Sequence, residues 1–128
     1  MFKYRGKDLM TNNWVYGHYS THQGLHVITG ADDTFAEIDG KTLGVSWGQK
    51  DSRDQDIFTG NNIKVEMTDW NTGKVIVEEV REVQFKDGKF GIDWGEFQPV
   101  FTALTDFNPA VTKFTVVGNK WEDAHEGD

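Results

Sequence analysis

The dipeptide Asp87-Gly88 places the strongest constraint on this fold, because it predicts a tight turn between two segments of alternating apolar residues. Both residues tolerate the positive φ angles that a two-residue type I′ hairpin turn requires. Such a turn sets the strand register, since a shift of one residue would move every side chain to the opposite face. The predicted facing pairs are Lys86–Lys89, Phe85–Phe90, Val83–Ile92 and Arg81–Trp94.

Similar patterns recur along the chain and predict a mainly β protein with little helix. Aromatic and β-branched residues at 14–19 favour a strand, which Gln23-Gly24 turns back into a partner strand at 25–29. Gly17 lies inside the first of these strands and predicts a bulge or a close approach of another backbone. Residues 63–67 alternate apolar and polar side chains ahead of a glycine-containing hairpin loop.

Four less regular segments complete the predicted fold. They are an acidic loop at 30–39 with room for one helical turn, a short strand at 42–47, a helical turn at Leu104–Phe107 that ends before Pro109, and a last strand at 113–117 turned by Gly118-Asn119. The alternation is interrupted at Glu78-Glu79, which predicts a β-bulge there.

The segment from Trp47 to Val65 combines a polar loop with apolar anchors. Its first part, residues 48–56, holds glycine, serine and charged residues and predicts a loop. Ile57 and Phe58 then predict buried anchors, and Gly60 predicts a backbone angle that other residues avoid. We therefore expect this segment to organise the fold around it.

The length of 128 residues predicts one compact domain, 1–128, with residues 1–40 as a candidate semi-independent lobe. Only 37% of the residues are hydrophobic but 13% are aromatic, which predicts a small core of large side chains. The absence of cysteine excludes disulfides, thiolate metal sites and cysteine nucleophiles. No apolar run reaches the roughly 18 residues of a membrane-spanning helix, and no signal-peptide pattern opens the chain. We therefore expect a cytoplasmic protein without a membrane partner.

The charge balance disfavours nucleic acid as a partner. The chain carries 21 acidic and 13 basic residues, a net charge of −8, and it has no run of Lys or Arg. Exposed aromatic rings would offer a stacking platform for bases or sugars. Because the candidate rings lack basic neighbours, core packing and interface anchoring are favoured for them. They are Trp14, Tyr16, Trp47, Trp70 and Trp94.

The histidines His18, His22 and His26 repeat at four-residue spacing and raise the alternative of a metal-dependent enzyme. This spacing would align them on one face of a helix. The surrounding aromatic and β-branched residues instead predict a hairpin, on which they share a face only if the turn preserves the alternation. Surface histidines are the favoured interpretation, and no metal site is expected.

Other residues that could carry chemistry show no catalytic pattern. The acidic positions in 32–39 and 51–56 do not match a calcium-binding loop and predict solvated loops, the second neutralised by Lys50 and Arg53. No serine lies in a G-x-S-x-G sequence. We therefore expect no catalytic residue and no cofactor.

Four separated segments share an order and spacing that cover nearly the whole chain. They are Tyr4-Arg5-Gly6-Lys7 with Trp14-Val15-Tyr16-Gly17, Gly48-Gln49-Lys50-Asp51 leading to IFTGNNIKV at 57–65, Val83-Gln84-Phe85 with Gly91-Ile92, and VVGNKWE at 116–122. Together they resemble the YopX family, small proteins encoded by bacteriophages and prophages of Gram-positive bacteria.

Two departures from the family pattern concern the second segment. Thr59 and Asn61 stand where the family usually has Glu and Asp. Any catalytic or metal-binding role of those carboxylates is therefore absent from this chain. Asn61 can still replace Asp in a local hydrogen bond to the backbone, so we interpret this position as turn chemistry.

The resemblance implies a mostly β fold of small twisted antiparallel sheets, partly barrel-like, and a homo-oligomeric phage accessory protein in the cytoplasm of a bacterial host. The strand that follows Gly60 is also reminiscent of SH3-like barrels, by fold analogy alone. We expect a non-enzymatic protein that contacts itself or a host protein, with a nucleic-acid-binding barrel and a metal-dependent enzyme as alternatives. The candidate interaction and family-signature residues are Trp14, Tyr16, Trp47, Asp51, Ile57, Phe58, Gly60, Gly118, Asn119 and Trp121.

Overall fold

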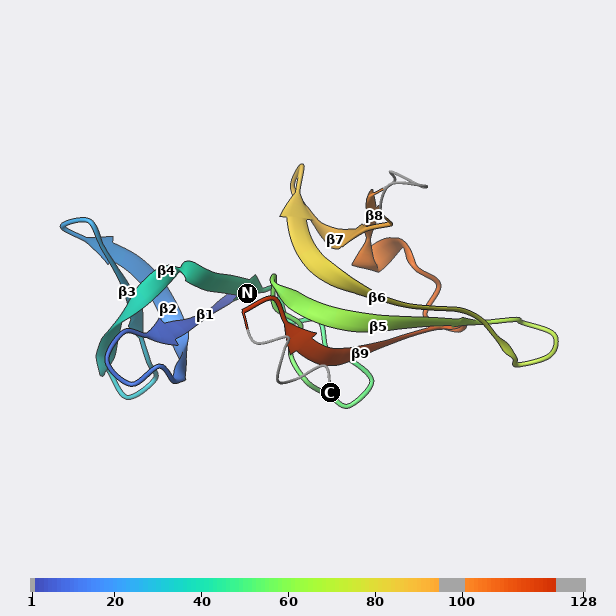
Figure 1. Cartoon of the computed structure of the whole chain (residues 1–128), viewed down its shortest axis with the longest axis horizontal. Helices are drawn as coiled ribbons and strands as arrows, with labels where there is room; N and C mark the ends of the chain where they lie inside the picture. The colour runs from blue at the N-terminus through green and yellow to red at the C-terminus, as the bar shows by residue number, and fades with distance from the viewer. Residues whose placement is uncertain (1, 95–100, 122–128) are drawn as a thin grey trace. The chain divides into compact units, whose positions relative to one another are not determined.

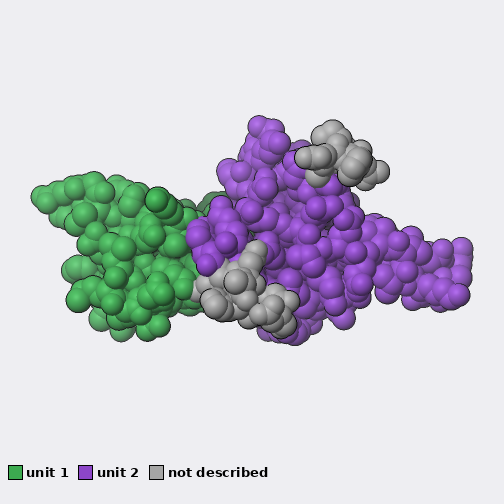
Figure 2. Space-filling model, viewed as in Figure 1, with its two compact units in different colours: residues 1–48 green, residues 49–128 purple. Residues whose placement is uncertain are grey.

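β-Strands dominate the computed structural model, which describes residues 2–94 and 101–121 (Figure 1). Within these ranges only one short 3₁₀ helix interrupts the strands, so the predicted mainly β fold is confirmed. Contacts divide the chain into two compact units, Met1–Gly48 and Gln49–Asp128 (Figure 2). Glu122, the last residue of the fourth family segment, lies outside the described residues.

The first unit is a closed antiparallel barrel with the strand order β1-β2-β3-β4. Its strands are β1 (Lys3–Asp8), β2 (Trp14–His22), β3 (Leu25–Thr29) and β4 (Phe35–Ser46). The predicted β2–β3 hairpin is confirmed, with His22 paired to Leu25 across the turn. Both turn residues adopt positive φ angles, 52° at Gln23 and 83° at Gly24. The barrel-like element expected from the family resemblance therefore lies in this unit.

Strand β4 corrects the prediction for the acidic segment. The loop covers only residues 30–34, and the strand then runs without a break from Phe35 to Ser46, so no helical turn forms. Closure of the barrel explains this length. The first part of β4, residues 35–37, pairs with β3, whereas residues 38–46 pair with β1.

The barrel interior is small and depends on glycines. Ile28 and Ile38 are its fully buried apolar side chains. A Cβ added at Gly6 would lie 2.3 Å from Ile38 Cδ1, so the glycine makes room for that side chain. A Cβ at Gly17 would lie 2.0 Å from the carbonyl oxygen of Thr29, which confirms the predicted close backbone approach.

The second unit is an open five-stranded sheet with the order β8-β7-β6-β5-β9. The strands are β5 (Asn61–Thr68), β6 (Val75–Lys86), β7 (Lys89–Asp93), β8 (Phe101–Ala103) and β9 (Thr112–Asn119), with the helix η1 (Leu104–Asp106) after β8. One face is buried, and its fully or nearly fully buried residues are Ile57, Phe58, Ile63, Val65, Val83, Ile92, Ala103 and Leu104. The predicted anchors and the alternation of β5 are therefore confirmed.

The hairpin around Asp87-Gly88 has the predicted register through Val83–Ile92. The expected fourth pair, Arg81–Trp94, is wrong, because the pairing of β6 with β7 ends at Val83–Ile92. Strand β7 ends at Asp93, whereas the longer β6 continues alongside β5. A hairpin pattern alone cannot show where the shorter of its two strands ends.

The β-bulge in β6 lies nearer the start of the strand than predicted. Glu78 and Glu79 stay in register with β5, and the irregularity falls where Thr68 pairs with Val75 and Met67 with Val77. Ile76 is the extra residue between these pairs. The alternation of apolar and polar residues is interrupted because the apolar Val80 faces solvent, where it is 53% exposed.

The C-terminal part largely follows the prediction. One turn of 3₁₀ helix, η1, forms before Pro109, and β9 contains the predicted last strand. Gly118 and Asn119 still belong to β9, so they extend the strand and do not turn it. The strand after Gly60 begins the open sheet and takes no part in the closed barrel. Within the described ranges, no helix has the length and apolarity needed to cross a membrane.

Candidate functional site

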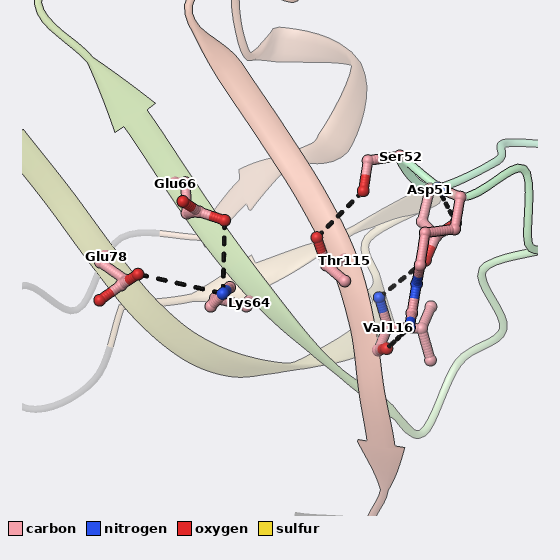
Figure 3. A network of polar contacts seen from close by, with 8 residues as sticks. Asp51, Ser52, Lys64, Glu66, Glu78, Thr115 and Val116 are labelled. Carbon is pink, nitrogen blue, oxygen red and sulfur yellow. Dashed lines mark hydrogen bonds and ion pairs between the residues drawn. The ribbon is translucent and has the colours of Figure 1, made fainter. Parts of the chain in front are cut away.

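The loop before β5 covers the outer edge of β9. An edge strand exposes unpaired backbone groups that invite pairing with another chain. Here Ser52 N–H donates to Phe114 O at 2.8 Å, and the Arg53 guanidinium donates to Val116 O at 2.5 Å. Val116 N–H in turn donates to the Asp51 carboxylate at 2.9 Å (Figure 3). The loop thus replaces a neighbouring strand.

Asp51 is the centre of this edge cap, which we define as residues 50–56. Its side chain is buried, and one carboxylate oxygen accepts the N–H groups of Arg53 and Gln55 at 2.8 and 2.9 Å. Burial raises the pKa of Asp51, but hydrogen bonds from three backbone N–H groups and the Arg53 charge outweigh it, so the pKa falls below 3.8. The prediction of a solvated Asp51 is therefore wrong.

The other charges of the edge cap behave as expected for a surface loop. Lys50 lies 3.0 Å from Asp56, and this ion pair accompanies a short β-bridge between the two residues. The hydrogen bond and the charge of Asp56 raise the pKa of Lys50. Asp54 is exposed and adopts a φ of 63°.

A second cluster joins the start of β5 to the end of β9. The Asn61 side chain accepts the buried Phe58 N–H at 2.7 Å and donates to Gly118 O at 3.3 Å, as the turn interpretation predicts. Gly60 has a φ of 87°, and a Cβ there would lie 2.5 Å from the Trp121 ring. The glycine is therefore required both by its backbone angle and by the ring above it.

The structure thus brings together most of the predicted family-signature residues. Seven of them lie in the sheet unit, in the edge cap and the cluster around Gly60: Asp51, Ile57, Phe58, Gly60, Gly118, Asn119 and Trp121. Trp14 and Tyr16 lie on β2 of the barrel unit, and Trp47 follows β4, half-buried. The hydrogen bonds assign the sheet cluster a structural role.

A groove lies beside the edge cap, within the sheet unit. Its volume is about 430 Å³, which falls in the range of small-ligand pockets. Phe107 and Phe114 form its aromatic floor, with ring centroids 5.3 Å apart in an edge-to-face arrangement. The lining residues are Gln49, Lys50, Asp51, Ser52, Leu104, Thr105, Phe107, Pro109, Thr112, Lys113 and Phe114.

Two polar atoms of residues that line this groove lack protein partners. Gln49 Oε1 and Thr112 Oγ1 are both buried, and neither makes a hydrogen bond within the protein. A buried acceptor without a donor costs roughly 1–3 kcal/mol. Sequence reasoning missed the groove, because its lining comes from segments separated by more than fifty residues.

The barrel unit presents a different surface on β1 and β2. Lys3, Arg5 and Lys7 occupy alternate positions of β1, so they share one face, on which Arg5 is buried and Lys3 and Lys7 reach solvent. Register places Lys7 opposite Trp14 and Arg5 opposite Tyr16. Arg5 Cζ lies 4.2 Å and Lys7 Nζ 5.3 Å from the centre of the Trp14 ring. The expectation that these aromatic rings lack basic neighbours is therefore wrong.

The hairpin separates the three histidines. Thr21 pairs with His26 and His22 with Leu25, so His26 points to the face opposite His18 and His22. His26 Nδ1 is instead hydrogen-bonded to the Tyr19 hydroxyl at 2.6 Å, and the two rings stack. Across residues 2–94 and 101–121, no three His, Asp or Glu side chains form a group able to hold a metal ion.

Fold and site together define an all-β protein with a closed barrel and an edge-capped open sheet. In comparisons with known proteins, residues 3–125 match the family described as YopX protein. The chain therefore belongs to the YopX family. No curated protein gives a significant match.

Proposed function

We propose that this chain is a non-enzymatic phage or prophage accessory protein that works in the cytoplasm of a bacterial host through contacts with proteins, foremost a second copy of itself. The family resemblance supports the phage context and the homo-oligomer. The observation that supports protein contacts is the exposed apolar end of the β5–β6 hairpin.

That hairpin extends beyond its neighbouring strand (Figure 1). The pairing of β5 with β9 ends at Met67–Thr112, and Thr68 N–H donates to Val111 O at 2.9 Å, so residues 69–75 reach past the sheet. Trp70 is 75% exposed at the tip, and Ile76, the extra residue of the bulge, is 64% exposed. Exposed aromatic anchors of this kind are typical of interaction sites.

Charged residues lie further along the two strands of this hairpin. On the same strands, Lys64 Nζ lies 3.5 Å from a Glu66 oxygen and 4.0 Å from a Glu78 oxygen (Figure 3). Interfaces combine an apolar centre with a polar rim in this way. A partner would therefore bury Trp70 and Ile76 and leave the ion pairs at its border.

The proposal is tested by measuring molar mass with light scattering over a range of protein concentrations. We expect a mass above 14.6 kDa that rises with concentration. A second arm captures bound proteins from the host with the wild type and with a Trp70→Ala, Ile76→Ser double variant. A constant monomer mass together with identical capture by both proteins would contradict protein contacts at the hairpin.

The basic and aromatic face of the barrel favours a second function, the binding of single-stranded nucleic acid. Cations that follow the backbone and rings that stack on bases are the two elements of such sites. The barrel unit also carries little of the net negative charge. Residues 1–48 hold five acidic and four basic residues, whereas the rest of the chain holds 16 acidic and nine basic residues. Repulsion of phosphate is therefore weakest there.

Retention of single-stranded oligonucleotides at about 50 mM salt tests this second function, since phosphate contacts are strongest at low ionic strength. We expect Tyr16→Ala and Lys3→Glu to weaken retention, and Lys89→Glu on the sheet unit to serve as the matched charge control. Absence of any retention by the wild-type protein would rule the function out.

A further inference from the structure

We propose that the groove beside the edge cap receives Trp70 from a second copy of this chain. The inference rests on the proposed self-association and names its contact. One chain supplies both halves: a groove with an aromatic floor and an uncovered indole at the tip of a hairpin.

The groove suits an indole in size and surface. Its volume of about 430 Å³ accommodates a large side chain, and Phe107 and Phe114 offer ring edges and faces. Aromatic pairs gain roughly 0.5–1.5 kcal/mol beyond the burial of their area when they stack with an offset or meet edge to face. An aliphatic side chain would not gain this part of the interaction.

The polar atoms of the groove complement the indole as well. Its N–H group is a donor and not an acceptor, and Gln49 Oε1 is a buried acceptor without a partner. A hydrogen bond between them would satisfy the Gln49 oxygen, which has to turn from its buried position toward the groove to accept it. The 75% exposure of Trp70 shows that its own chain does not cover most of the ring.

Charges at the edge of the contact are also complementary. Lys113 is exposed and lines the groove. Asp69 directly precedes Trp70 on the hairpin and is itself only partly buried. Opposite charges at the border of an interface guide the partners into register and raise the association rate.

Because hairpin and groove are different surfaces, the contact is either reciprocal in a two-fold dimer or repeated from copy to copy. In both cases one intact hairpin and one intact groove are enough for a contact. This property distinguishes it from a symmetric pairing of two hairpins.

The decisive experiment mixes two defective variants. Trp70→Ala removes the inserted ring, and Thr105→Arg places a bulky cation in the groove from an exposed position. Sedimentation velocity should show wild-type association, a mainly monomeric protein for each variant alone, and recovered association in an equimolar mixture. Circular dichroism checks that both variants keep the β fold.

Two matched controls accompany these variants. Phe35→Ala removes an aromatic residue with the same 75% exposure from the barrel unit, and Thr21→Arg adds a cation at another exposed threonine. Both should associate like the wild type. Gln49→Leu keeps the size of the side chain but removes the acceptor, and should weaken association about 2- to 10-fold.

The outcomes separate the two proposals. A wild type that associates while both variants behave identically to it overturns the groove contact and leaves self-association standing. A wild type that associates while the mixture stays monomeric also overturns the contact. Normal association of Thr105→Arg together with a monomeric Trp70→Ala overturns it in favour of paired hairpins. A wild type that is monomeric at every concentration overturns the groove contact and self-association together.

Discussion

The barrel unit and the sheet unit solve the same problem of unpaired strand edges in different ways. Every strand of the barrel has two neighbours, because β4 pairs with both β3 and β1. The sheet is open, and the edge cap satisfies the backbone of β9 while β8 is only three residues long. Closure removes edges, whereas an open sheet must blunt them.

This difference determines which surfaces each unit leaves for contact with partners. A barrel that uses all its edges internally leaves only side chains for contact with partners. The sheet keeps a protruding hairpin and a groove, and the groove is lined by side chains that include Phe114 of the capped strand. We conclude that the edge cap directs association of the sheet unit to side-chain contacts.

The largest expected effect comes from Gly17→Ala in the barrel, compared with Gly91→Ala in the sheet. Each new Cβ would meet a backbone carbonyl oxygen, at 2.0 Å from Thr29 and 2.3 Å from Thr102. Opening β2 from β3 breaks the closed ring and exposes its interior, so we expect a loss of more than about 3 kcal/mol, the upper end for overpacking. Opening β8 frees only a short edge strand.

Hydrogen exchange measures this contrast. Gly17→Ala should remove protection at Ile28 and Ile38, whereas Gly91→Ala should leave Ile63 protected. Equal global loss of protection in both variants would show that the closed barrel depends no more on its strand contacts than the open sheet does.

Gly60→Ala should cause the next largest loss of stability. A φ of 87° is unfavourable for alanine by roughly 1–2 kcal/mol, and the displaced Trp121 ring adds roughly 1–3 kcal/mol. Gly73→Ala is the matched control, because its φ is 71° but no atom lies within 4 Å of the new Cβ. Urea unfolding should show a clearly larger loss at Gly60, and equal losses would exclude a packing role of Trp121.

Asp51→Asn tests the edge cap directly. One amide oxygen cannot replace two carboxylate oxygens, so Val116 N–H loses its partner and unfolding free energy falls by roughly 1–3 kcal/mol. Ser52→Ala, which removes only the exposed 3.1 Å contact with Thr115, should change it by less than about 0.5 kcal/mol. Equal effects of the two substitutions would contradict the central role of Asp51.

The pH dependence of stability gives a second measure of the same contact. The pKa of Asp51 is lower in the folded than in the unfolded chain. Its stabilisation is therefore complete above the unfolded pKa of about 4 and is lost as the pH falls through the folded pKa. The wild type should lose more stability than Asp51→Asn when the pH falls below about 4. Parallel curves would show that Asp51 contributes nothing through its charge.

Asn61→Asp, which restores the residue usual in the family, has the smallest expected effect. The carboxylate still accepts the Phe58 N–H, but it can no longer donate to Gly118 O at 3.3 Å. We expect a loss of roughly 0.5–1.5 kcal/mol, the net contribution of one hydrogen bond. Asn61→Ala should lose more in the same urea titration, because it also orphans the buried Phe58 N–H.

Local patterns in the sequence determined the strands and turns. Alternation predicted β5, the Asp-Gly pair predicted the β6–β7 register, and Ile57 and Phe58 were recognisable as anchors before a glycine turn. These features depend on side-chain period and on backbone angles within a few residues. The family resemblance likewise rests on short segments, and the match over residues 3–125 confirms it.

Contacts between remote segments set which strands pair at a distance and what the loops cover, and no local pattern shows them. The pairing of β5 with β9 and the closure of the barrel through β4 depend on contacts between remote segments. Asp51 appeared to be one of several solvated acids until the fold placed it against the backbone of Val116, 65 residues away. The groove and the basic face around Trp14 also depend on contacts between strands. Residue order along the chain does not specify such proximity.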